Sequence, residues 1–153
     1  MREAIAHGIA YLSEDRQGTG LLTGFPIRDN AALSSLQRYR RGPLLSKNKL
    51  EEGAKHRIRE LQIRCEGGVQ PIRDLSGGNQ QKVAIAKGLD IHPSVYIFDE
   101  PTRGVDVGAR REIYLIMHGL AASGVAILLI SSDLGEILGN CQRSLVMSEG
   151  KVT

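Results

Sequence analysis

The chain has 153 residues, of which 41% are hydrophobic and 24% are charged, a balance typical of a folded globular domain and not of a disordered one. The longest uninterrupted apolar run, residues 125–130, is far too short to cross a bilayer, and the first residues lack a signal-peptide pattern. With 20 Lys and Arg against 17 Asp and Glu, the net charge is +3 and the two signs are interspersed. Composition therefore excludes a membrane-spanning chain and does not favour a nucleic-acid binder.

Residues 1–22 are expected to form a short strand that runs into a loop. The apolar segment 8–12 is followed by a polar, glycine-rich stretch at 13–20. A short apolar run that ends in turn-forming residues is typical of a strand followed by a loop.

Residues 24–75 have a helical pattern. Asp29 is expected to cap a helix over 30–38, which the glycine–proline pair at 42–43 should end. Apolar residues at helical spacing predict a second helix that ends near residues 67–68, and its apolar face consists of Leu50, Ala54, Ile58 and Leu61.

Two further features of the sequence have no single chemical interpretation. The densest basic stretch, 37–55, is either a solvated helix face or loop, or a site for a phosphate backbone, and Tyr39 is its one aromatic residue. Cys65 and Cys141 have neither metal-ligand spacing nor a CxxC motif, so we expect reduced thiols in a cytoplasmic protein.

Residues 76–153 alternate between helical and strand patterns. Continuous apolar strands separated by amphipathic helices indicate an α/β fold in which helices cover both faces of a parallel sheet. The predicted helices span 80–89, 109–120 and 134–141, and the predicted strands span 95–98, 125–130 and 144–147, with a turn at 149–150.

The strand predicted at 95–98 ends in two adjacent acids, Asp99 and Glu100. Ligands bind at the carboxyl edge of open α/β sheets. Asp99 could therefore reach a Mg²⁺ ion, and Glu100 could polarise an attacking water. Two solvated acids after a strand are the alternative interpretation of this segment alone.

A second candidate site precedes the helix predicted at 80–89, where Ser76 is followed by Gly77 and Gly78. Two glycines let the backbone approach a ligand closely, and a helix N-terminus offers free N–H groups and partial positive charge to an anion. Taken alone, the segment is better explained as a Gly-Gly turn with a serine cap.

Together, the strings LSGGNQQKV and VYIFDEPTRGVDVGA closely resemble the nucleotide-binding subunits of ABC transporters, and the resemblance covers essentially the whole chain. It implies that Asp99 and Glu100 are the Walker B aspartate and the catalytic glutamate. It also implies that Asp106 is the aspartate of the loop that crosses to the partner subunit, the D-loop. The signature motif implied by the resemblance consists of Leu75, Ser76, Gly77, Gly78, Asn79 and Gln80.

The strings GNQQKV, EPTRGVDVGA and YLSEDRQGTGL are similar to the C-terminal part of the second nucleotide-binding domain of ribose, galactose and arabinose importers. The implied parts are a strand and loop at 1–22, a helical subdomain with the signature at 23–89, and a Walker B and C-terminal α/β part at 90–153. Glu14 occupies the family's Q-loop glutamine position, and Ser132 occupies its H-loop histidine position. Because serine does not titrate near neutral pH, we expect an ATP site on this domain's own face to be degenerate.

The sequence contains no GxxxxGK[ST] string, the P-loop whose backbone N–H groups hold phosphates. The resemblance places that loop before residue 1, so the expected fold is a partial P-loop NTPase fold of the ABC ATPase type without its amino-terminal lobe. ABC ATP sites are composite. We therefore expect the chain to contribute its signature loop in trans to ATP held by a partner, and to be inactive or weakly active alone. Asp99 would hold Mg²⁺ only when a P-loop is supplied.

The resemblance thus implies an ATP-binding component of an ABC-type carbohydrate importer, located at the cytoplasmic face of the cell membrane as a peripheral protein. Its expected partners are another nucleotide-binding domain, membrane permease subunits and, indirectly, a periplasmic sugar-binding protein, with no nucleic acid. The alternatives are a non-catalytic interaction module, a gene remnant of such a subunit, or an ABC ATPase acting on DNA or ribosomes. An apolar sheet edge left unpaired would also make the chain prone to aggregation.

Overall fold

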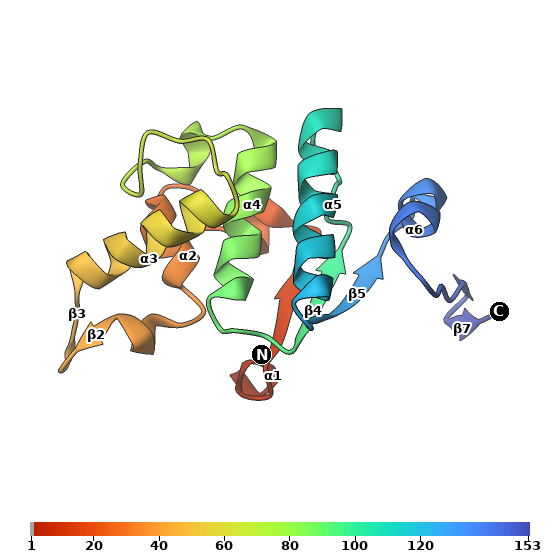
Figure 1. Ribbon diagram of the computed structural model, residues 1–153, viewed down its shortest axis with the longest axis horizontal. Coiled ribbons are helices and arrows are strands. Elements are labelled where there is room, and N and C mark those ends of the chain that lie inside the picture. Colours follow the sequence, from red (N-terminus) through yellow and green to blue (C-terminus); the bar gives the residue numbers. More distant parts are fainter. Residues whose placement is uncertain (1) are drawn as a thin grey trace.

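The computed structural model describes residues 2–153, and its centre is a three-stranded parallel sheet (Figure 1). The strands are β1 (Ile9–Leu12), β4 (Val95–Asp99) and β5 (Ala126–Ile130), in the order β1-β4-β5. Tyr11 lies opposite Ile97, and Ile97 lies opposite Leu128. The sheet confirms the α/β class and the strands predicted at 8–12, 95–98 and 125–130.

Two helices, α4 (Gly77–Leu89) and α5 (Val107–Ala122), pack side by side on one face of this sheet (Figure 1). Tyr96 and Phe98 of β4 are fully buried there, and their rings stack with centroids 4.3 Å apart. The Tyr96 hydroxyl donates a hydrogen bond to a carbonyl oxygen of α4 at 3.0 Å. Gly88 allows this close approach, because a Cβ at its position would lie 2.2 Å from the Tyr96 hydroxyl oxygen.

The opposite face of the sheet is largely open among residues 2–153. Tyr11, Leu128 and Ile130 lie on that face and are 45%, 51% and 46% exposed. The prediction that helices cover both faces is therefore wrong for the described residues. A continuous apolar run shows that both faces of a strand are apolar, but it does not show that both are covered.

A helical subdomain formed mainly by α2 (Ile27–Ala32) and α3 (Lys47–Glu60) packs beside α4. Leu50, Ala54 and Leu61 are buried and Ile58 is partly buried against the core, which confirms the predicted apolar face. The helix α3 ends at Glu60 and not near residues 67–68, because the chain leaves helical geometry at Leu61 and turns toward the signature segment.

The helix α2 is shorter than predicted. It begins directly after Pro26, whose restricted φ suits a helix start, so the prediction that Asp29 caps it is wrong, and Asp29 lies in its first turn. The last residues of the predicted helix lie in η2 (Leu36–Tyr39). A hairpin of β2 (Arg40–Arg41) and β3 (Leu44–Leu45) follows it. The other short helical segments are α1 (Arg2–Ala6), η1 (Arg16–Gly20) and η3 (Ile72–Asp74).

A buried polar network ties the helical subdomain to the C-terminal end of α4. Asp90, which is 4% exposed, accepts hydrogen bonds from Ser35 and from the Tyr39 hydroxyl, the latter at 2.7 Å. Arg57 of α3 lies 3.7 Å from the same carboxylate and donates to the Leu89 carbonyl oxygen at 2.9 Å. Burial, together with the hydrogen bond to Asp90, raises the pKa of Tyr39 to about 12. The network thus fixes the end of α4 opposite to the signature segment.

Beyond β5 the chain forms α6 (Leu134–Asn140) and an antiparallel hairpin of β6 (Met147–Ser148) and β7 (Lys151–Val152), at one end of the molecule (Figure 1). The turn predicted at 149–150 is confirmed, with φ values of 50° and 77°. The strand predicted at 144–147 is wrong, because the chain pairs with itself in this hairpin instead of adding to the parallel sheet. Among residues 2–153, no helix has both the length and the apolarity needed to cross a bilayer.

Candidate functional site

The signature segment forms the N-terminus of α4, and hydrogen bonds hold its serine in place. The side-chain N–H of Asn79 donates to the Ser76 hydroxyl oxygen at 2.9 Å. The side-chain carbonyl oxygen of Asn79 accepts the Arg64 backbone N–H, also at 2.9 Å. Ser76 makes no side-chain cap to its own helix. Since a hydroxyl can accept and donate at once, the Ser76 proton is available to a ligand at this helix end.

The two signature glycines let the start of α4 lie against the start of α5. A Cβ on Gly78 would lie 2.4 Å from the Ala109 Cβ, and a Cβ on Gly77 would lie 3.3 Å from the Gly104 carbonyl oxygen. Asp106 caps α5 by accepting the Ala109 backbone N–H at 3.0 Å. The signature and the segment from Gly104 to Asp106 therefore form one continuous surface.

The ends of the signature motif face inward and support the loop. Leu75 is 7% exposed and belongs to the main apolar core. Gln80 is 6% exposed, and its side-chain amide donates to the carbonyl oxygens of Ile72 and Leu75 at 3.3 and 3.1 Å. Of the six motif residues, Ser76 and Asn79 are thus the ones whose polar side chains lie at the surface.

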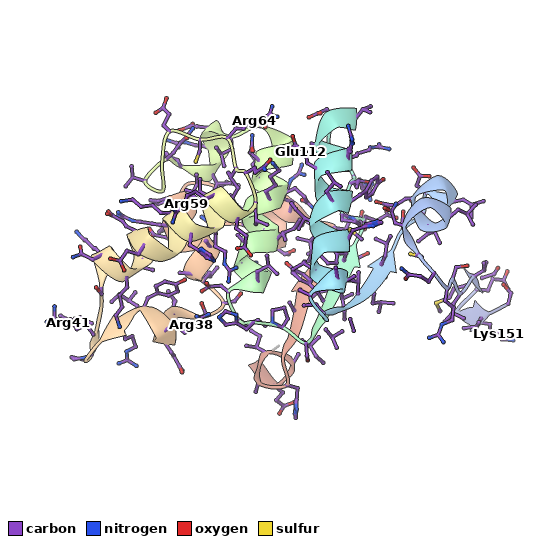
Figure 2. The ribbon with its side chains drawn as sticks, in the orientation of Figure 1. Arg38, Arg41, Arg59, Arg64, Glu112 and Lys151 are labelled. Atoms are coloured by element: carbon purple, nitrogen blue, oxygen red, sulfur yellow. The ribbon has the colours of Figure 1, made fainter. Side chains whose placement is uncertain are left out.

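A shallow depression of about 90 Å³ lies between the signature and the start of α5. It is lined in part by Ser76, Asn79, Asp106, Arg64 and Glu112. Arg64 and Glu112, labelled in Figure 2, form an ion pair across it at 3.0 Å. Both signs of charge therefore meet at its rim.

Lys82 supports this depression through Glu112, a role that no sequence pattern indicated. It is 2% exposed, and its ammonium group lies 2.7 Å from a Glu112 carboxylate oxygen and 2.9 Å from the Gln62 carbonyl oxygen. The hydrogen bond from Lys82, with a smaller contribution from Arg64, lowers the pKa of Glu112. A lysine within a helix of buried residues gives no indication of its partner on another helix.

The carboxyl edge of the sheet carries the two acids. Asp99 is the last residue of β4, and the Tyr11 hydroxyl donates to its carboxylate at 2.6 Å. This hydrogen bond raises the pKa of Tyr11. The second Asp99 oxygen remains for a hard cation such as Mg²⁺, which proteins bind through one or two carboxylates together with substrate phosphates. Asp99 fits one such ligand, and the described residues contain no cluster of three or more candidate metal ligands.

Glu100 is held in place by the strand next to it. Its φ of 46° is unusual for a residue with a side chain, and its backbone N–H donates to the Ile130 carbonyl oxygen at 2.9 Å. Its carboxylate accepts the Ser132 backbone N–H at 2.7 Å. The parallel pairing of β4 and β5 thus brings Glu100 and Ser132, the expected Walker B and H-loop positions, together.

The loop after β1 completes this edge. Glu14, the expected Q-loop position, forms an ion pair with Arg103. Arg16, which sequence analysis missed, donates to the Gln81 side chain at 3.3 Å, and its guanidinium lies beside the signature at Gly77. Burial lowers the pKa of Arg16. A single arginine in a glycine-rich loop offered no spacing signal for this contact.

Comparisons with known proteins agree with this geometry. The family model described as ABC transporter matches residues 1–103. A putative ribose/galactose/methyl galactoside import ATP-binding protein of Burkholderia ambifaria is 51% identical over 99% of this chain, and the ribose import ATP-binding protein RbsA of Bacillus cereus is 47% identical over 98%. The chain spans 30% of the length of each of these curated relatives.

Solved structures share the fold at low sequence identity. A dimeric ATP-binding cassette bound to ADP and Pi superposes with a TM-score of 0.79 at 20% identity, covering 99% of this chain and 62% of that one. A nucleotide-free cassette from an ABC transporter gives a TM-score of 0.77 at 22% identity, covering 99% and 61%. The family match, the relatives and the shared fold agree, and the chain belongs to the ABC transporter ATP-binding family.

Proposed function

We propose that the chain acts within the ATP-binding component of an ABC-type carbohydrate importer and contributes its signature loop in trans to ATP held by a second nucleotide-binding domain. The observation that carries this proposal is the arrangement of Ser76. Its hydroxyl oxygen is occupied by Asn79 at 2.9 Å while its proton is free at the exposed start of α4. A hydroxyl proton and helix N–H groups at one point suit a phosphate oxygen.

The names of the relatives support carbohydrate as the transported class, because both are described as import ATP-binding proteins for ribose or galactosides. The partners under this proposal are a second nucleotide-binding domain and membrane permease subunits, with a periplasmic sugar-binding protein acting through them. The chain would then lie at the cytoplasmic face of the membrane as a peripheral component.

On the chain's own face, we assign Asp99 to hold Mg²⁺ and Glu100 to orient the attacking water. Mg²⁺, when bound, would neutralise charge on the β- and γ-phosphates. The bond from Tyr11 fixes one Asp99 oxygen, and the Ser132 N–H fixes the Glu100 carboxylate. These 153 residues include no phosphate-binding GxxxxGK[ST] string. Both acids would therefore act only on ATP whose phosphates another segment holds.

A specific observation favours a reduced or non-catalytic role for the ATP site on the chain's own face. The Glu14 carboxylate is engaged by Arg103, so this Q-loop position offers an ion pair instead of a free amide. Ser132 contributes its backbone N–H to Glu100, and its hydroxyl cannot carry charge near neutral pH. Under this variant of the proposal, the chain serves the partner's ATP site and turns over little ATP on its own face.

The test mixes the chain with a nucleotide-binding domain that has an intact P-loop and measures ATP hydrolysis. Ser76→Ala should lower the rate of ATP hydrolysis that the chain stimulates in its partner at least about tenfold, because a hydrogen bond to a charged group contributes roughly 1.5–3 kcal/mol. Ser144→Ala, an exposed serine outside the signature, is the matched control and should leave the rate unchanged. Equal rates for Ser76→Ala and wild type would contradict the proposal.

A further inference from the structure

The net positive charge of the chain arises from one short segment of the helical subdomain. Five of the 20 basic side chains lie within residues 30–50, and that segment contains no acidic residue. The other 15 basic side chains face all 17 acidic ones, so the rest of the chain has a net charge of −2. The five basic residues are Arg38, Arg40, Arg41, Lys47 and Lys49.

These residues surround the hairpin β2–β3, which we call the basic hairpin (residues 40–47). It lies at the end of the molecule opposite to α6 and the C-terminus (Figure 1). Its turn is at Gly42, whose φ is 64° and whose Cβ position faces open space. Arg41 lies at the tip of the hairpin in Figure 2. The hairpin therefore extends away from the apolar core.

Each face of the basic hairpin combines an arginine with a leucine. Arg40 pairs with Leu45, and Arg41 pairs with Leu44, and partners directly opposite each other in an antiparallel ribbon share a face. Leu44 is 73% exposed and Leu45 is 49% exposed. Among residues 2–153, Arg40, Arg41 and Lys47 take part in none of the ion pairs. The tip thus presents cations without ion-pair partners together with exposed leucines.

The base of the hairpin is fixed to the subdomain. Tyr39 is 8% exposed and donates to Asp90, and its carbonyl oxygen accepts the Ser46 backbone N–H at 2.8 Å. Arg38 donates to the Asp90 carbonyl oxygen, and Lys49 donates to the Arg40 carbonyl oxygen at 3.0 Å. The base therefore holds the exposed tip in a defined position.

We propose that the basic hairpin binds the surface of an anionic lipid bilayer. Leu44 and Leu45 enter the headgroup region, and Arg40, Arg41 and Lys47 face the lipid phosphates. Exposed leucines flanked by unpaired cations match an interfacial anchor, in which apolar burial adds to attraction by anionic lipids. Single-stranded nucleic acid is disfavoured as the occupant, because the only aromatic residue of the segment, Tyr39, is buried and cannot stack on bases.

The test is flotation of the full chain with vesicles of phosphatidylcholine alone or with about one third phosphatidylglycerol. Wild type should float only with the anionic vesicles, and binding should weaken as salt is raised. Arg41→Ala should weaken binding about fivefold, the effect expected for one basic residue near an anionic surface. Leu44→Ser should weaken it at every salt concentration.

Lys151→Ala is the matched control, because it removes the same charge from an exposed residue at the other end of the molecule (Figure 2). It should bind like wild type. An equal loss with Arg41→Ala and Lys151→Ala would overturn the proposal, as would equal binding to vesicles with and without phosphatidylglycerol. One further combined result would overturn the proposal in favour of a site for any polyanion. In that result, polyglutamate or an oligonucleotide displaces the chain from vesicles, and Leu44→Ser binds the vesicles like wild type. This proposal stands or falls independently of the role of Ser76.

Discussion

The contact between Gly78 and Ala109 predicts a specific loss of stability. A Cβ added at Gly78 would lie 2.4 Å from the Ala109 Cβ, far inside the contact distance of two methyl groups, so Gly78→Ala must push α4 and α5 apart. Overpacking of this kind costs about 1–3 kcal/mol. The replacement of glycine within a helix returns up to about 1 kcal/mol. We therefore expect a net destabilisation of about 1–2 kcal/mol.

The measurement is urea-induced unfolding followed by circular dichroism, with the midpoint and slope compared among variants. Gly119→Ala in α5 is the matched control, because a Cβ there meets nothing within 4 Å. That variant should be as stable as wild type or more stable, by up to about 1 kcal/mol. In the double variant, Ala109→Gly should restore part of the stability that Gly78→Ala loses. If Gly78→Ala behaves like Gly119→Ala and Ala109→Gly gives no rescue, the close packing of the signature on α5 is refuted.

Two further predictions concern buried polar groups. The pKa of Tyr39 is raised to about 12 from its ordinary value of 10.0, so the contribution of its hydrogen bond to stability is complete below pH 10. That contribution should be lost as pH rises through about 12, and tyrosinate absorbance should follow the loss. Tyr39→Phe should abolish this titration step and cost about 1 kcal/mol through the lost bond to Asp90. Lys82→Met should destabilise the fold by roughly 1–3 kcal/mol. Because Lys82 is the main cause of the lowered Glu112 pKa, an NMR titration of this variant should show the Glu112 pKa rising. An unchanged Glu112 titration would contradict the placement of Lys82.

The main elements were predictable because local patterns determine them. The strand at β4 followed from an apolar run that ends in acids. The helix α5 followed from apolar residues at helical spacing, and Asp106 lies directly before it as its cap. The signature and Walker B strings also predicted the polar residues that lie at the start of α4 and at the end of β4. Within the signature, the hydrogen bond from Asn79 to Ser76 joins residues three positions apart at the start of one helix, a spacing at which side chains can meet.

The remaining contacts depend on packing between distant segments. Lys82 and Glu112 meet because α4 and α5 lie side by side, and Glu14 meets Arg103 because β1 and β4 pair in parallel. Neither pair has a spacing in sequence that would reveal it. The uncovered sheet face also escaped prediction, because apolar residues indicate a preference for burial and do not identify a covering element.

Photo-crosslinking with ATP that bears a reactive group on its γ-phosphate tests whether the signature loop contacts ATP held by a partner domain. The chain is mixed with a nucleotide-binding domain that has an intact P-loop, and the labelled peptide is identified by mass spectrometry. If the signature loop acts in trans, label should appear on the segment Leu75–Gln80 only when the partner is present, and Ser76→Ala should reduce it. Equal labelling of the chain without the partner, or label at Asp99 and Glu100 with none on the signature, would contradict it.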